Sequence, residues 1–219
     1  MQYNKHLRGL YAITDNKLIK ANEFINKVEQ AIIGGAKIIQ YRDKSNQYQL
    51  RLEQAQALSQ LCNKYQIPLI INDDVALAQK VGADGVHLGS NDADIYHARA
   101  QLGEQAIIGI SCYNQLSLAL NAEKAGANYV AFGRFFNSAT KPNAIGCNVE
   151  ILREARQRLN CPLVAIGGIT PDNGETLIKA GADCLAVIHG LFKQADVTAA
   201  AQEYAKILVT YESQIIITT

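Results

Sequence analysis

Short apolar runs alternate along this chain with longer stretches in which apolar residues recur at helical spacing. The stretch from Leu50 to Tyr65 is typical of the helical segments, because Leu50, Ala57, Leu58 and Leu61 lie near one face of a helix. The apolar runs between such stretches predict eight strands, near Leu10–Thr14, Ile38–Tyr41, Leu69–Asn72, Gly85–Leu88, Ala106–Ser111, Tyr129–Phe132, Leu163–Ile166 and Cys184–Ile188.

Continuously apolar strands separated by amphipathic helices are typical of a parallel sheet that helices cover on its outer face. Eight such units favour a closed (β/α)₈ TIM barrel of the α/β class, with a doubly wound open sheet as the alternative. The length of 219 residues suits one domain of this kind. We therefore predict a single TIM-barrel domain over residues 1–219, with its core at about 7–209 and a poorly ordered tail at 211–219.

A Gly-Ala pair precedes four of the predicted strands and repeats at intervals of roughly 45 to 55 residues, about the length of two βα units. Glycine at this point supplies the left-handed residue that ends a helix, and alanine lets the following turn pass close beneath its neighbours. The four segments are Gly35-Ala36-Lys37-Ile38, Gly82-Ala83-Asp84-Gly85, Gly126-Ala127-Asn128-Tyr129 and Gly181-Ala182-Asp183-Cys184.

The amino-acid composition limits the kinds of partner that the protein is expected to bind. The formal net charge is +1, which does not favour a broad surface for nucleic acid or anionic membrane. The first ten residues lack the apolar core of a signal peptide, and no apolar run approaches the ~20 residues of a membrane span, so we expect a cytoplasmic protein. The cysteines show no metal-binding spacing and are expected to be reduced, mostly buried thiols: Cys62, Cys112, Cys147, Cys161 and Cys184.

Two polar clusters follow predicted strands, Gln40-Tyr41-Arg42-Asp43-Lys44 and Asn72-Asp73-Asp74. Active sites of TIM barrels form at the carboxyl ends of the strands, so these clusters should face one site. Arg42 and Lys44 suit a polyanion such as a diphosphate, although surface charges paired with Asp43 are the alternative.

The predicted metal ligands are Asp73 and Asp92, which follow consecutive strands and can hold a hard cation, Mg²⁺, between them. The alternative for each is a helix cap, and Asp74 is the better candidate for a pure cap. A capping role does not explain why Asp73 lies beside a basic cluster that suits a diphosphate.

Three further groups follow later strands. The loop after Phe132-Gly133 carries Ser138, Thr140 and Lys141, which suit a phosphate, with an ordinary surface loop as the alternative. Gly167-Gly168 lets a ligand approach the backbone, although tight packing also selects glycine. His189 ends the eighth strand and could face a phosphate, whereas His87, inside the fourth strand, is interpreted as a hydrogen-bonded core residue.

Taken together, these positions resemble the family of thiamine-phosphate synthases and thiazole tautomerases over nearly the whole chain. The resemblance rests on motifs in the expected order: Gln40-x-Arg42-x-Lys44, Asn72-Asp73, Gly89-x-x-Asp92, Ser111, Ser138-x-Thr140-Lys141 and Gly167-Gly168-Ile169-Thr170. It implies a transferase that joins hydroxymethylpyrimidine diphosphate to hydroxyethylthiazole phosphate with release of pyrophosphate, by a dissociative, Mg²⁺-assisted substitution.

The same resemblance implies the roles of individual residues. Catalytic roles would fall to Arg42, Lys44, Ser111 and Lys141, and Asp73 and Asp92 would hold Mg²⁺ against the diphosphate. The pyrimidine diphosphate would contact Gln40, Arg42, Lys44, Asn72, Ser111 and Lys141, and the thiazole phosphate would contact Ser138, Thr140, Gly168, Ile188 and His189.

Two positions depart from the family pattern, since Ser138 replaces a common threonine and His189 replaces a serine. Two alternative functions remain. A thiazole tautomerase of the same fold needs an acid–base residue where Tyr113 stands, and a non-catalytic phosphate-binding barrel would not need the metal carboxylates or Lys141. Small-molecule partners are implied, and the sequence is compatible with a homo-oligomer.

Overall fold

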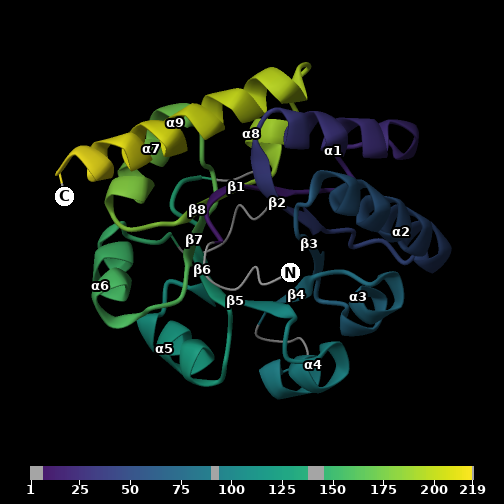
Figure 1. The fold of residues 1–219 in the computed structure, drawn as a ribbon, viewed down its shortest axis with the longest axis horizontal. Coiled ribbons are helices and arrows are strands. Elements are labelled where there is room, and N and C mark those ends of the chain that lie inside the picture. Colours follow the sequence, from purple (N-terminus) through teal and green to yellow (C-terminus); the bar gives the residue numbers. More distant parts are fainter. Residues whose placement is uncertain (1–6, 90–93, 138–145, 219) are drawn as a thin grey trace.

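The computed structural model describes residues 7–89, 94–137 and 146–218, with side chains as far as Leu208. Eight parallel strands are hydrogen-bonded in chain order, and β1 also pairs with β8, so the sheet closes into a barrel. Figure 1 shows this ring of strands with the helices outside it. The predicted (β/α)₈ barrel is confirmed, and the β1–β8 pairing excludes an open sheet. The strands are β1 (Gly9–Ile13), β2 (Ala36–Tyr41), β3 (Leu69–Asn72), β4 (Gly85–Leu88), β5 (Ile107–Tyr113), β6 (Tyr129–Gly133), β7 (Leu163–Ile166) and β8 (Cys184–Val187).

Helices fill the segments between these strands and cover the outside of the barrel (Figure 1). They are the short 3₁₀ helix η1 (Ala21–Glu23) and α1 (Phe24–Ile33), α2 (Tyr48–Tyr65), α3 (Val75–Val81), α4 (Ile95–Leu102), α5 (Leu116–Lys124), α6 (Glu150–Arg158), α7 (Pro171–Lys179), α8 (His189–Phe192) and α9 (Val197–Thr218).

Predicted and observed boundaries differ by one or two residues at several strands and by more at the last helix. Strand β5 continues past Ser111 to Tyr113, because an irregularity in its pairing with β6 shifts the register between these residues. Helix α9 runs to Thr218, whereas the sequence predicted that the core ends at about residue 209. Residues 210–218 contain neither glycine nor proline, so no residue there stops the helix. Poor order of residues 211–219 stays a prediction.

Alternating strand residues divide the core into two layers. Side chains that point inward fill the barrel, and those that point outward pack against the helices. The inner cluster contains Tyr11, Ile13, Ile38, Ile70, Ile107, Tyr129, Ala131, Val164, Cys184 and Ala186. The larger outer cluster includes Leu58 of α2, Phe132 of β6 and Leu177 of α7, and all three are fully buried.

The Gly-Ala pairs lie where the sequence placed them, before β2, β4, β6 and β8, and all four glycines have positive φ angles. The residue after the pair has a role that the sequence did not reveal. The side chain of Asp84 accepts a hydrogen bond from Leu69 N, and that of Asp183 accepts one from Leu163 N, each at 2.8 Å. These carboxylates join the amino ends of neighbouring strands, at the opposite end of the barrel from the predicted site.

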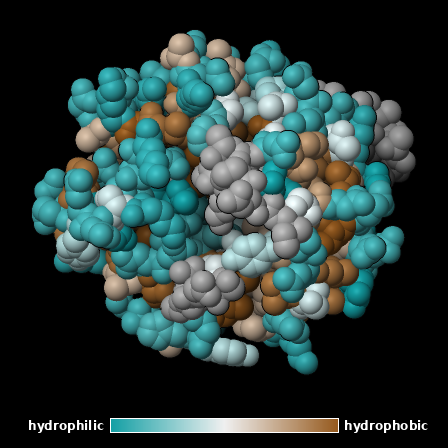
Figure 2. All heavy atoms as spheres, turned by 180° about the vertical axis from the view of Figure 1, so that it is seen from behind, coloured by the Kyte–Doolittle hydropathy of each residue, from teal (hydrophilic) through white to brown (hydrophobic). Residues whose placement is uncertain are grey.

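Large hydrophobic side chains are exposed at few places on the outer surface: among the described residues these are Ile33, Tyr48 and Tyr96. Figure 2 shows one face on which hydrophilic side chains predominate and hydrophobic ones form small separate patches. None of the helices in the described part of the chain is both long enough and apolar enough to span a membrane.

Candidate active site

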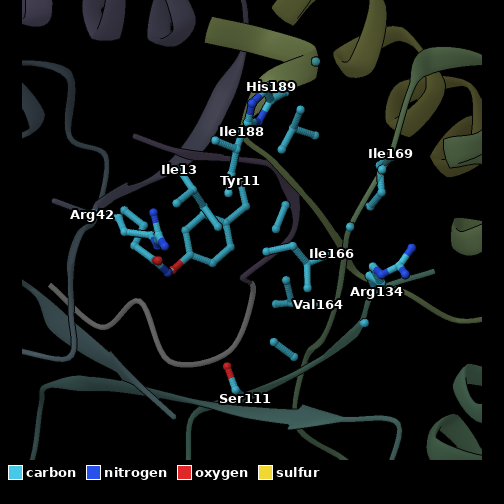
Figure 3. Close-up of a pocket in the computed structure, with 18 of the residues that line it drawn as sticks. Tyr11, Ile13, Arg42, Ser111, Arg134, Val164, Ile166, Ile169, Ile188 and His189 are labelled. Atoms are coloured by element: carbon cyan, nitrogen blue, oxygen red, sulfur yellow. The ribbon is translucent and has the colours of Figure 1, made fainter. Parts of the chain in front are cut away.

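A cavity of about 340 Å³ opens at the carboxyl ends of the strands. This volume falls in the lower part of the range typical of small-molecule sites. Its floor is apolar, formed by Val164, Ile166 and Ala186 among others, and polar side chains stand around it. In Figure 3, Tyr11 of β1, Arg42 just after β2, Ser111 of β5 and His189 of α8 approach the same space. The prediction that His189 ends the eighth strand is wrong, because β8 ends at Val187 and His189 begins α8. Seven of the residues predicted from the sequence line this cavity: Gln40, Arg42, Asn72, Ser111, Gly168, Ile188 and His189.

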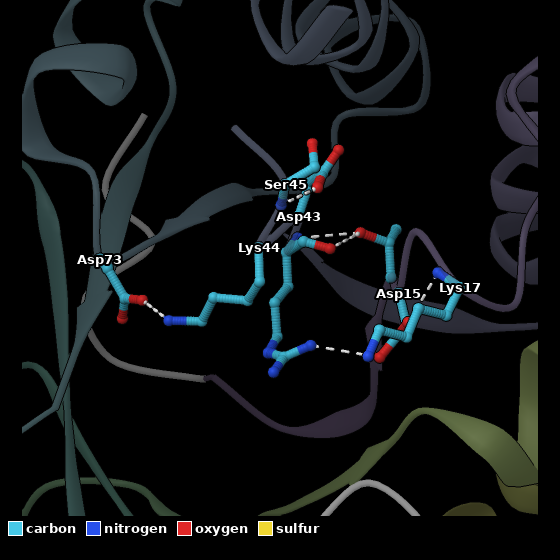
Figure 4. A network of polar contacts seen from close by, with 8 residues as sticks. Asp15, Lys17, Asp43, Lys44, Ser45 and Asp73 are labelled. Atoms are coloured by element: carbon cyan, nitrogen blue, oxygen red, sulfur yellow. Dashed lines mark hydrogen bonds and ion pairs between the residues drawn. The ribbon is translucent and has the colours of Figure 1, made fainter. Parts of the chain in front are cut away.

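Arg42 is fixed at the rim by residues that follow β1. Its guanidinium Nη1 lies 3.2 Å from Oδ2 of Asp15, which is itself buried. Its backbone N–H donates to Thr14 Oγ1 at 2.8 Å, and the same hydroxyl donates to the Arg42 carbonyl at 3.3 Å. Figure 4 shows these contacts. The alternative in which Arg42 pairs with Asp43 at the surface is wrong.

Lys44 and Asp73 face a second, more open hollow, and Asn72 lines both hollows. The Lys44 ammonium forms an ion pair with the Asp73 carboxylate, which joins the ends of β2 and β3 (Figure 4). Arg42 therefore lies at the deep cavity and Lys44 at the open hollow, and Asn72 borders both. We call the border that carries Arg42, Lys44, Asn72 and Asp73 the polar rim.

Helix caps are made by neighbours of the predicted metal ligands. Asp74 caps α3 by accepting from Leu77 N at 2.9 Å, and Asp94 caps α4 by accepting from His97 N at 2.7 Å. Capping is therefore wrong as the alternative role for Asp73. Asp73 itself has a φ of +64°, an unusual backbone conformation for a residue other than glycine.

Hard oxygen donors gather where the sequence predicted a metal. The Asp73 carboxylate and the Asn72 side chain border the same hollow, and oxygen atoms of this kind suit Mg²⁺. No cluster of three or more potential ligands from His, Cys, Asp and Glu occurs among residues 7–89, 94–137 and 146–218. The second predicted ligand, Asp92, lies outside the described residues, and so do Ser138, Thr140 and Lys141.

The glycine pair after β7 has a clear packing role. A Cβ atom at Gly168 would lie 2.4 Å from the carbonyl oxygen of Asn137, and one at Gly167 would lie 2.3 Å from Arg134 Cβ. Both glycines also have positive φ angles. Their small size therefore lets the segment after β6 form one wall of the cavity. Arg134 lines this wall and donates from Nη1 to Asn137 Oδ1 at 2.8 Å.

The sequence did not reveal a chain of hydrogen bonds across the barrel interior. Gln40 Nε2 donates to Tyr11 OH at 2.8 Å, and Tyr11 OH lies 2.7 Å from Tyr129 OH. Tyr129 OH lies 2.9 Å from His87 Nδ1, and His87 Nε2 lies 2.9 Å from Ser111 Oγ. His87 is thus hydrogen-bonded, as predicted, but it also lines the cavity.

Burial raises the pKa of the Tyr11 and Tyr129 hydroxyls, the two phenols of this hydrogen-bond chain, so both side chains stay protonated and uncharged. Alternation along β1 and β6 assigns each tyrosine to one face of its strand, but both faces are buried, so the pattern does not tell which face lies inside the barrel. Their hydrogen-bonded partners come from distant strands, which a strand pattern does not specify.

Comparison with known proteins agrees with this geometry. The model of a family described as thiamine monophosphate synthase matches residues 10–191. The chain belongs to this family. A thiamine-phosphate synthase from Nitrosococcus oceani is 56% identical over 198 residues, which cover 90% of this chain and 91% of that protein. A thiamine-phosphate synthase from Marinobacter nauticus is 52% identical over 198 residues, covering 90% and 89%.

Among solved structures, the thiamine phosphate pyrophosphorylase from Pyrococcus furiosus is 37% identical, with a TM-score of 0.83. The match covers 94% of this chain and 98% of that one. Membership of the thiamine monophosphate synthase family makes this chain an enzyme, a transferase of thiamine biosynthesis. The resemblance seen in the sequence motifs is confirmed.

Proposed function

We propose that this enzyme joins hydroxymethylpyrimidine diphosphate to hydroxyethylthiazole phosphate, giving thiamine phosphate and pyrophosphate. The observation that carries the proposal is the position of Asn72, which lines both the deep cavity and the hollow of Lys44 and Asp73. A ring held in the cavity can thus extend a charged group past Asn72 to the polar rim.

The diphosphate is assigned to this rim. Arg42 is the best-fixed cation there, because Asp15 and Thr14 hold both its guanidinium and its backbone. Lys44 is more exposed, and its pairing with Asp73 keeps the ammonium at the hollow. Lys141 is the third proposed cation.

These cations suit a dissociative substitution. The bond between the pyrimidine methylene carbon and the diphosphate oxygen breaks, and its electron pair leaves with the pyrophosphate. Arg42, Lys44 and Lys141 neutralise the charge that develops on this leaving group. The thiazole nitrogen then donates its electron pair to the methylene cation and forms the new carbon–nitrogen bond. No side-chain nucleophile takes part.

Asp73 and Asp92 are the proposed ligands of Mg²⁺. The donor set fits, since Asp73 and Asn72 present hard oxygens at the rim where the diphosphate is assigned. When bound, Mg²⁺ would supply positive charge that stabilises the leaving pyrophosphate. Lys44 pairs with Asp73 here, and its flexible side chain can also reach toward the diphosphate.

The thiazole phosphate is assigned to the other side of the cavity. Gly168, Ile188 and His189 line that side. The glycine allows a close approach to the backbone, Ile188 offers an apolar contact for the ring, and the imidazole of His189 can donate to the phosphate. Ser138 and Thr140 are the proposed hydroxyl donors from the loop after β6.

The experiment is pyrophosphate release by the purified enzyme given both substrates, first with Mg²⁺ and then with excess chelator. Metal-dependent release, matched in amount by thiamine phosphate, is the expected result. Tight binding of thiazole phosphate without release would instead indicate the tautomerase or the non-catalytic binder. Omission of the thiazole phosphate is the control for simple hydrolysis of the diphosphate.

A further inference from the structure

Five side chains, joined by four contacts, connect two walls of the cavity. The chain of contacts runs from Gln40 on β2 through Tyr11, Tyr129 and His87 to Ser111 on β5. All four heavy-atom distances lie between 2.7 and 2.9 Å, which are ordinary hydrogen-bond lengths. Gln40 and Ser111 also line the cavity, so the two ends of this chain face the ligand.

The number of hydrogens that these side chains carry gives the hydrogen-bond chain a direction from donor to acceptor. Each tyrosine has one hydroxyl hydrogen, and a neutral imidazole has one N–H. All of these hydrogens are used within the four contacts only if all donors point the same way along the chain. The reversal of only some of the contacts would leave a buried hydroxyl hydrogen without an acceptor, which costs free energy.

The amide of Gln40 selects between the two directions. Because Nε2 donates to Tyr11, the Tyr11 hydroxyl donates to Tyr129. The Tyr129 hydroxyl then donates to Nδ1 of His87, and Nε2–H of His87 donates to Ser111. This order directs the Gln40 carbonyl oxygen away from Tyr11 and the Ser111 hydrogen away from His87.

We propose that Tyr11, Tyr129 and His87 are positioning residues that fix Gln40 as an acceptor and Ser111 as a donor toward the pyrimidine ring. The inference rests on the proposed function, whose substrate carries an amino group that donates and ring nitrogens that accept. An oxo analogue, with a carbonyl in place of the amino group and a hydrogen on a ring nitrogen, has the opposite pattern. The direction of the chain therefore selects the amino form.

The expected selectivity follows from the penalty for mismatched polar groups. A buried site that is built to hydrogen-bond one pattern strongly rejects the reversed pattern, because its own groups are then left unpaired. Loss of a hydroxyl in the middle of the hydrogen-bond chain removes the constraint on the orientation of the Gln40 amide. Without the Tyr129 hydroxyl, Tyr11 can donate to Gln40, and the amide can turn its NH₂ group toward the ligand.

The variant Tyr129→Phe tests this proposal, since it removes the hydroxyl and keeps the buried ring. The measurement is kcat/KM for the amino pyrimidine diphosphate and for its oxo analogue. We expect the amino-to-oxo ratio to fall by about tenfold or more, as the loss of one directed hydrogen bond implies. The KM for thiazole phosphate should stay the same.

Tyr41→Phe is the matched control. Tyr41 is also buried and its hydroxyl donates to Gln54 Oε1 at 3.0 Å, on the helix side of β2. This variant should keep the wild-type ratio. An unchanged ratio in Tyr129→Phe would overturn the proposal, and so would an equal loss of activity with both analogues, which is what a merely structural role predicts.

A second measurement does not depend on activity. Nitrogen NMR of the free wild-type protein should show His87 as the neutral tautomer with hydrogen on Nε2, and Tyr129→Phe should weaken that preference. A tautomer with hydrogen on Nδ1 would reverse the chain and refute the proposal. Failure of the proposed function would appear differently, as wild-type enzyme that releases no pyrophosphate from the amino substrate.

Discussion

The guanidinium of Arg42, at the end of β2, lies 3.2 Å from the carboxylate of Asp15, which follows β1. The arginine side chain is only 18% exposed and the aspartate only 8%. A partly buried, charge-assisted pair of this kind holds the cation in place before substrate arrives, so less ordering is needed on binding.

We expect Arg42→Ala to lower the coupling rate by roughly 10²–10³, because the charge on the leaving pyrophosphate loses a fixed cation. Lys141→Ala should also lower it sharply. Arg153→Ala is the control, since Arg153 pairs with Glu150 on the exposed surface of α6. Steady-state kinetics check the prediction, and unchanged turnover in both Arg42→Ala and Lys141→Ala would contradict the leaving-group assignment.

Asp73→Asn should raise the Mg²⁺ concentration needed for half-maximal activity by about tenfold or more, because a charged ligand is replaced by a neutral one. The measurement is a Mg²⁺ titration of pyrophosphate release. Asp196→Asn is a suitable control, since Asp196 only accepts from Ala199 N at the start of α9 and asparagine caps equally well. An Asp73→Asn enzyme with the wild-type metal dependence would refute this ligand.

Gly109→Ala should destabilise the barrel by about 1–3 kcal/mol through overpacking. An added Cβ would lie 1.9 Å from the Tyr129 ring, which fills the interior beside Gly109. Urea unfolding measures the difference. Gly146→Ala, where a Cβ would meet no atom of the described residues within 4 Å, should be close to neutral. Equal midpoints for the two variants would show that the interior can accommodate the methyl group.

Stability should fall as pH rises above about 8.5, where thiols of the unfolded chain ionise. Burial raises the pKa of Cys62 and Cys112 to about 12 and that of Cys147 to about 11. The folded state then holds protons that the unfolded state releases, so the free energy of unfolding decreases with pH in this window. Urea midpoints at pH 7, 9 and 10 check the trend.

Cys62→Ala isolates one thiol in that comparison. The variant should show a shallower loss of stability between pH 7 and 10 than the wild type, even if its stability at pH 7 is lower. A parallel pH dependence for the two proteins would mean that Cys62 does not contribute. The buried thiols should also react slowly with alkylating reagents at pH 8 until urea unfolds the chain.

Local chemistry made much of the fold predictable. Strands such as β3 and β4 lie where apolar runs placed them, because each is a short, mainly apolar segment between two helices. Strand boundaries that depend on pairing with another strand could not be predicted from the sequence. The extension of β5 to Tyr113 depends on its register with β6, and no feature within β5 itself reports that pairing.

In the candidate site, too, some residues could be predicted from the sequence and others could not. Gln40, Arg42, Asn72 and Ser111 were identified from the sequence because each stands at the carboxyl end of a strand, and the barrel brings such positions together. The partner of Arg42 was not identified. Asp15 follows β1, and the pairing of β1 with β2 in the sheet places it within reach of the guanidinium.

The sequence by itself determined the number and order of the strands and the type of chemistry at their ends, because hydrophobic periodicity and residue type are local properties. The tertiary structure alone decided which side chains form hydrogen bonds and ion pairs with one another. Tyr11 and Tyr129 are 118 positions apart in the chain, yet their hydroxyls lie 2.7 Å apart inside the barrel. A contact of that kind depends on the shape of the closed barrel, because strand tilt and register bring the two residues to the same depth.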